Sequence, residues 1–143
     1  MSDIIAERLV ALCRRYRIDL VYVFGSRAQE IVRRIKSEGP PAAQTASDVD
    51  IGVLPGPGVV YDSREKVRLM ADLEDLLDVG RVDLVILPEA PPFLAVDIIR
   101  GELLYEVNPD RSAEYELYVL RRAGDLAPFE RERITQILMG TSV

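Results

Sequence analysis

Three short apolar runs alternate with segments of helical periodicity, and this alternation constrains the fold more than any other feature. The runs are rich in Val, Ile, Leu and Tyr and end near Gly or Pro, as buried strands do. The intervening segments repeat apolar residues every three or four positions, which predicts amphipathic helices. In chain order we expect a helix at 3–17, a strand at 19–24, a helix at 26–36, a strand at 47–54, a helix at 62–79 and a strand at 81–88. This order indicates the α/β (α+β) class, with helices packed on a small mixed β-sheet.

The helix after the second strand carries the clearest end signals. Asp62 and Glu65 have the spacing of a capping box, and Gly80 is expected to end the helix. The last third of the chain predicts shorter elements: a helix at 93–100, a strand at 102–107, and helices at about 110–123 and 129–139 on either side of Pro128, which is expected to interrupt them.

Composition excludes several classes of function. The 143 residues suit one domain, and the absence of histidine excludes His-based catalytic triads and imidazole metal ligands. The net charge is −6, with 10 acidic against 4 basic side chains in residues 44–90. Such a chain is not expected to bind nucleic acid directly, and a phosphate ligand near its centre would need metal ions. The single cysteine, Cys13, lies on the apolar face of the first helix and favours a reducing, cytoplasmic setting. No apolar run approaches the ~20 residues that span a membrane.

A Gly-Ser pair follows the first strand directly. Gly25 and Ser26 are either an ordinary turn or a cradle for phosphate, and a turn is the commoner use of such a pair. As a cradle, the glycine would let the backbone approach a phosphate, the serine hydroxyl would donate, and the next helix would offer free N–H groups. Arg27 would add a charged donor.

Three aspartates mark the starts of the next two strands. Asp48 and Asp50 are two residues apart on a strand, so both carboxylates point to the same side of the sheet. Asp83 opens the third strand. Each alone is compatible with a solvated turn or strand edge, but together they predict an oxygen site of the kind that Mg²⁺ prefers. Two such ions can activate an attacking hydroxyl and stabilise a leaving pyrophosphate.

The segments "VFGSRA", "SDVDIGVL" and "RVDLVIL" together resemble the minimal nucleotidyltransferases of the DNA polymerase β-like superfamily. Within that superfamily the chain is similar to MntA-type antitoxins encoded with HEPN-domain toxins. The resemblance covers roughly residues 5–107 and implies a single nucleotidyltransferase domain over 1–143, with a helical C-terminal extension from 108.

The resemblance also implies a reaction and roles for individual residues. Gly25, Ser26 and Arg27 would hold the triphosphate of ATP, while Asp48 and Asp50, completed by Asp83, would bind two Mg²⁺ ions. Asp83 would in addition assist removal of the acceptor's proton. In the antitoxin branch AMP is transferred to a tyrosine of the HEPN-type RNase partner and silences it. Transfer to a small-molecule hydroxyl and a non-catalytic masking role are the alternatives.

One departure from the family pattern stands out. Ser26 and Asp48 are separated by 21 residues, roughly twice the usual number. The extra segment predicts a lengthened helix and a Pro-rich outward loop, which loop-closure entropy tolerates well. Its Arg33, Arg34 and Lys36 are expected to form a solvated helix face, with contact to a triphosphate or partner as the alternative.

Overall fold

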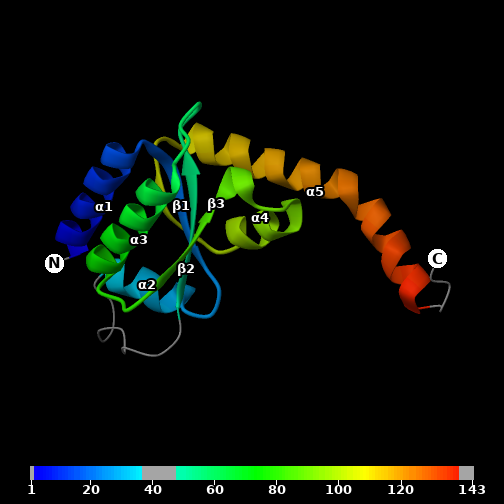
Figure 1. Ribbon diagram of the computed structural model, residues 1–143, viewed down its shortest axis with the longest axis horizontal. Coiled ribbons are helices and arrows are strands. Elements are labelled where there is room, and N and C mark those ends of the chain that lie inside the picture. Colours follow the sequence, from blue (N-terminus) through cyan, green and yellow to red (C-terminus); the bar gives the residue numbers. More distant parts are fainter. Residues whose placement is uncertain (1, 37–47, 139–143) are drawn as a thin grey trace.

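A computed structural model describes the backbone of residues 2–36 and 48–138 (Figure 1). Its elements follow the alternation read from the sequence. In chain order they are α1 (Ser2–Tyr16), β1 (Ile18–Phe24), α2 (Ala28–Ile35), β2 (Val49–Pro55), α3 (Ser63–Leu77), β3 (Val82–Ile86), the 3₁₀ turn η1 (Leu87–Glu89), α4 (Pro92–Ile99), β4 (Glu102–Glu106) and α5 (Pro109–Leu138). The Pro-rich loop expected before Asp48 lies outside the described residues.

The strands form one mixed sheet in the order β3-β2-β1-β4. β1 runs antiparallel to β2 and β4, whereas β2 and β3 are parallel. The end of β1 therefore lies beside the start of β2, which in turn lies beside the start of β3. The predicted small mixed sheet is confirmed, and this connectivity brings the polar strand ends together at one edge.

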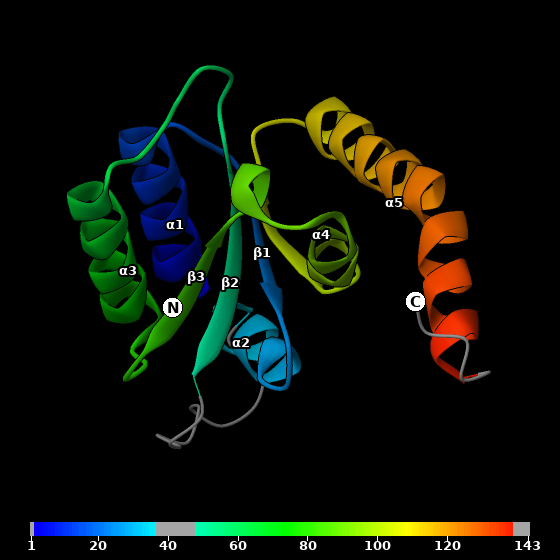
Figure 2. The same ribbon diagram turned by 45° about the vertical axis from the view of Figure 1, so that its right-hand side comes forward.

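Helices cover both faces of the sheet. α1, α2 and α3 lie on one side, and α4 and α5 lie on the other (Figures 1 and 2). Alternate residues of β1 serve the two cores: Val21 and Val23 pack with the first group, and Leu20 and Tyr22 with the second. All four are buried. A strand buried on both faces reads as a continuous apolar run, which is the pattern seen in the sequence.

The two ends of α3 differ in how well local sequence specified them. The capping box is confirmed: the Glu65 N–H donates to Asp62 Oδ1 at 2.8 Å, and the Asp62 N–H donates to Glu65 Oε1 at 3.3 Å. The expected ending at Gly80 is wrong. Asp78 is the C-cap and adopts the left-handed conformation with φ 52°. Aspartate tolerates this region better than most residues, so the helix ends before the glycine is reached.

The prediction that Pro128 interrupts the C-terminal helix is also wrong. α5 is continuous over 30 residues. Proline removes its own backbone donor, but the hydrogen bonds of the flanking turns can hold the helix on both sides. The N-terminal half packs on the domain through Tyr115, Val119 and Ala123, while the C-terminal part projects away from it (Figure 1). Within the described residues, no helix combines the length and hydropathy needed to cross a membrane.

Candidate active site

Backbone pairing gathers the predicted site residues at one edge of the sheet. Phe24, the last residue of β1, pairs with Asp50 of β2, and Asp50 pairs with Asp83 of β3. Gly25 directly follows Phe24, so the Gly-Ser turn and two of the carboxylates lie side by side. Asp48 stands one residue before β2. Strand pairing thus creates a proximity that the sequence could only suggest.

Gly25 lies against the carboxylate of Asp50. Its φ of +78° is in the left-handed region, and a Cβ built on it would lie 2.3 Å from Asp50 Oδ2. Only glycine satisfies both conditions, because it carries no Cβ. The neighbouring Ser26 is exposed, and within the described part of the chain its hydroxyl has no hydrogen-bond partner. The turn therefore offers a closely approachable backbone and an available hydroxyl beside a carboxylate.

Asp50 is the electrostatic centre of this edge. Burial raises its pKa above the ordinary value, and the charges of Asp83 and Asp48 and a hydrogen bond with Asp83 raise it further. The side chain is half-buried, so its negative charge is incompletely solvated. Because the charges of Asp48 and Asp83 disfavour ionisation of Asp50, a cation bound nearby would stabilise the ionised carboxylates.

Asp48 and Asp83 are less enclosed than Asp50. Asp83 is exposed, and Asp48 Oδ2 lies 3.5 Å from Arg81 Nε. The Arg81 side chain is 78% exposed, so this ion pair is weak. The sequence analysis missed it, although Arg81 stands just before the strand that pairs with β2. The Arg81 carbonyl also accepts from the Val49 N–H at 3.0 Å, which fixes the approach of the two strand starts.

The three carboxylates are suitable in chemistry but do not form a ready-made cage. Among residues 2–36 and 48–138, no group of three or more His, Cys, Asp or Glu side chains has metal-binding geometry. The oxygen donors are nevertheless of the type that Mg²⁺ prefers, and the proximity of Asp50 and Asp83 gives a negative pair that a cation would relieve. The residues present therefore fit a divalent ion in their chemistry.

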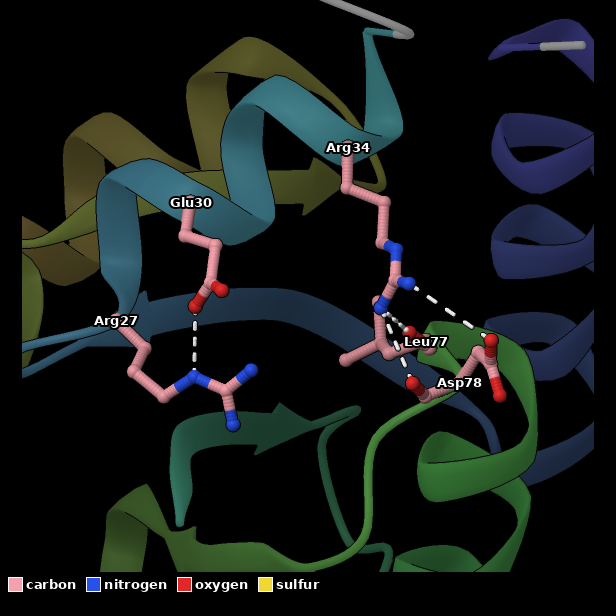
Figure 3. Close-up of polar contacts among 5 residues, drawn as sticks. All are labelled: Arg27, Glu30, Arg34, Leu77 and Asp78. Carbon is pink, nitrogen blue, oxygen red and sulfur yellow. Dashed lines mark hydrogen bonds and ion pairs between the residues drawn. The ribbon is translucent and has the colours of Figure 1, made fainter. Parts of the chain in front are cut away.

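Arg27 is more enclosed than a simple phosphate donor would be. Its side chain is 8% exposed, and its Nε donates to Glu30 Oε2 at 2.7 Å (Figure 3). The pair spans residues i and i+3 across the first turn of α2. The ion pair thus lies in the first turn of α2, where the Glu30 carboxylate is favoured near the positive end of the helix.

The expectation of a wholly solvated basic face on α2 is wrong for Arg34. Its side chain is 14% exposed, and Nη1 donates to the carbonyl oxygens of Leu77 and, at 3.1 Å, Asp78 (Figure 3). These carbonyls end α3, where a cation is favourable because helix-terminal C=O groups lack partners. Arg33 and Lys36 are exposed, as expected. Arg34 thus ties α2, and with it the Gly-Ser turn, to α3.

The fold and this edge of the sheet define the class of protein. A family profile described as polymerase beta, nucleotidyltransferase, matches residues 7–110. The chain belongs to the polymerase beta nucleotidyltransferase family. The predicted fold is confirmed as well. A search of curated protein sequences gave no match.

Solved structures with similar folds come from toxin–antitoxin complexes. A mutant of the MntA–HpeT toxin–antitoxin is 23% identical with a TM-score of 0.68, and the match covers 94% of this chain and 98% of that chain. A toxin–antitoxin with AMP-PNP is 23% identical, with coverages of 94% and 98% and a TM-score of 0.66. The complex of tri-AMPylated Shewanella oneidensis HEPN toxin with MNT antitoxin is 22% identical, with coverages of 97% and 99% and a TM-score of 0.66. At these identities the likeness shows a shared fold.

Proposed function

We propose that this protein is a Mg²⁺-dependent adenylyltransferase and the antitoxin of a toxin–antitoxin pair, transferring AMP from ATP to a tyrosine hydroxyl of a HEPN-type RNase toxin. Family membership supports nucleotidyl transfer. The fold shared with an MNT antitoxin in complex with an AMPylated HEPN toxin supports this partner. The complex with AMP-PNP supports ATP as the nucleotide.

The observation that carries the proposal is the contact between the Gly25 backbone and the Asp50 carboxylate, beside Asp83. An ordinary turn between a strand and a helix does not require its glycine to lie against a half-buried carboxylate. A site that brings triphosphate oxygens next to metal-binding oxygens needs this proximity, because charge neutralisation acts over short distances. The turn and the carboxylates are therefore interpreted as parts of one site.

Each residue has a distinct role in the proposed site. Gly25 and Ser26 would bind the triphosphate through backbone N–H groups and the serine hydroxyl, with Arg27 adding positive charge at the base of the turn. Asp48, Asp50 and Asp83 would hold Mg²⁺, which when bound would neutralise phosphate charge and favour deprotonation of the acceptor. Cytoplasmic placement, where ATP is available, belongs to the same proposal.

The proposed step exchanges one phosphorus–oxygen bond for another. The acceptor oxygen forms a bond to the α-phosphorus of ATP, while the bond from that phosphorus to the bridging oxygen of the β-phosphate breaks and pyrophosphate leaves. The acceptor's proton passes to a base, for which Asp83 is the candidate because it is exposed beside Asp50. This chain's residues thus position the nucleotide and receive the proton.

Transfer of label to the protein encoded next to this chain tests the proposal. The purified pair is incubated with Mg²⁺ and ATP labelled at the α-phosphate, and the label should appear on a tyrosine of a HEPN-type partner. Asp50→Asn should lower the initial rate at least about 100-fold, because it removes a charged oxygen ligand without changing side-chain size. Asp97→Asn, on an exposed position of α4, is the charge-matched control and should retain the rate.

The same assay separates the alternatives. Undiminished labelling by Asp50→Asn would refute the assigned site. Tight partner binding without any transfer would favour the masking role. Label on a small-molecule hydroxyl in place of the protein would identify a small-molecule transferase.

A further inference from the structure

A pocket lies at the opposite end of the sheet from the proposed active site. Its volume is about 550 Å³, and its walls come from the end of α1, the loop between β2 and α3, and the first turns of α3. Ile18 pairs with Pro55 at this end of the two strands, and Phe24 pairs with Asp50 at the other. The seven-residue strand β1 separates the ends by about 20 Å. Figures 1 and 2 show the β2–α3 loop at the top of the sheet and α2 at its bottom.

Three arginines from different elements line this pocket. Arg15 is in the last turn of α1, Arg17 lies between α1 and β1, and Arg68 is on α3. Within residues 2–36 and 48–138 none of them forms an ion pair or a side-chain hydrogen bond, although Arg15 stacks on the Tyr16 ring at 5.6 Å. Elsewhere in the described part of the chain Arg27, Arg34, Lys66, Arg81 and Arg111 are ion-paired, whereas exposed arginines such as Arg14, Arg100 and Arg121 are not. The distinguishing feature of the pocket is that three arginines without an ion pair, from different elements, line one concave surface.

The backbone beneath these arginines is tightly held. Arg17 has φ 56°, in the left-handed region that residues with a Cβ rarely adopt. Its carbonyl accepts the Gly56 N–H at 2.9 Å, which joins the α1–β1 connection to the loop after β2. The buried Tyr61 hydroxyl donates to the Tyr16 carbonyl at 2.5 Å, and the two rings meet edge to face. The pocket floor is thus pre-formed, which lowers the entropic cost of binding.

One carboxylate lines the pocket, and it is already engaged. Glu65 Oε1 accepts the Asp62 N–H in the α3 capping box. Three arginines and one glutamate leave two net positive charges in a protein whose overall charge is −6. Beside them stand apolar side chains, among which Val60 is 82% exposed. The surface thus pairs a cationic region with an uncovered apolar one.

We propose that this pocket binds a nucleoside polyphosphate, separately from the nucleotide consumed at the active site. Guanidinium groups form paired hydrogen bonds with phosphate oxygens, which matches the three arginines to the polyphosphate. The exposed Val60 and its apolar neighbours provide a surface for the base. The volume of the pocket lies in the range typical of small-molecule sites. The inference does not depend on transfer activity, because the two sites share no residue.

Amide chemical shifts measured without divalent ions locate the binding. ¹⁵N-labelled protein is titrated first with inorganic triphosphate and then with ATP in EDTA. We expect saturable shifts in residues 15–17 and 57–61, with ATP bound more tightly than triphosphate. The variant Arg15→Gln/Arg17→Gln/Arg68→Gln should weaken binding at least about tenfold, because it removes the charged donors. Val60→Ser should reduce the preference for ATP over triphosphate.

A charge-matched control distinguishes a site from general attraction. Arg14→Gln/Arg100→Gln/Arg121→Gln removes the same charge from exposed positions outside the pocket and should retain the affinity within about threefold. Equal loss in both triple variants, or shifts confined to residues 25–30 and 48–51, would overturn the proposal. Tighter binding of single-stranded RNA than of ATP at equal phosphate concentration would overturn the assignment to a free nucleotide. Far-UV circular dichroism verifies that both variants fold.

Discussion

Replacing Gly25 by alanine probes the contact on which the proposed active site depends. The substitution adds one methyl group at a backbone with φ +78°, 2.3 Å from Asp50 Oδ2. Two costs arise, one from the backbone conformation and one from displacement of the carboxylate. Gly58 isolates the first, because its φ is +77° and no heavy atom lies within 4 Å of a Cβ built there.

The expected magnitudes follow from this geometry. Alanine in the left-handed region costs about 1–2 kcal/mol, which should be the whole effect of Gly58→Ala. Gly25→Ala should cost about 1 kcal/mol more, because the short side chain of Asp50 has to leave its place against the turn. Asp50→Ala removes the clashing atoms and leaves Asp50 Cβ, which is 3.6 Å from the added methyl group, an ordinary contact distance. In that background the two glycine substitutions should cost the same.

Urea denaturation followed by far-UV circular dichroism measures these free energies of unfolding. The double-mutant cycle of Gly25→Ala with Asp50→Ala should give a coupling of about 1 kcal/mol, whereas Gly58→Ala with Asp50→Ala should give none. The transfer assay should show a larger rate loss for Gly25→Ala than for Gly58→Ala. Equal stability costs and equal rates for the two glycine variants would refute the reasoning that the turn and the carboxylate act together.

Two further predictions concern electrostatics and helix capping. Burial and the charges of Asp83 and Asp48 raise the pKa of Asp50 above its ordinary value of 3.8 in the folded protein. The folded state therefore binds the carboxyl proton of Asp50 more tightly than the unfolded state does. Without metal, the free energy of unfolding should fall as the pH rises above 3.8. Asp50→Asn should therefore raise Tm at pH 7 in EDTA, with a smaller gain near pH 4, and an unchanged or lowered Tm at pH 7 would contradict this. Arg34→Ala should cost about 1 kcal/mol in the urea assay, because the Leu77 and Asp78 carbonyls at the partly exposed end of α3 lose their charged donor. The exposed Arg33→Ala should stay within about 0.5 kcal/mol, and similar losses for both arginines would show that the capping contact contributes little.

Elements specified by their own residues were predictable from the sequence. The period of apolar side chains indicated α1 and α3, and the β-rich runs indicated β1, β2 and β3. The capping box at Asp62 and Glu65 involves groups three residues apart, so local sequence suffices to specify it. The ends at Gly80 and Pro128 were predicted wrongly, because local preference only sets a cost that other interactions can outweigh.

The sequence by itself determined the element types, the family and the residues that carry oxygen donors at strand ends. Only the tertiary structure decided how those residues meet. The antiparallel pairing of β1 with β2 put Gly25 against Asp50, and the parallel pairing of β2 with β3 put Asp83 beside Asp50. Likewise, only the packing of α2 against α3 places Arg34, which was expected on the surface, at the carbonyls that end α3. Only the tertiary structure brings Arg15, Arg17 and Arg68 to one pocket. These contacts join residues far apart along the chain, and strand register and helix docking determine them, whereas sequence periodicity reports only which face of each element is apolar.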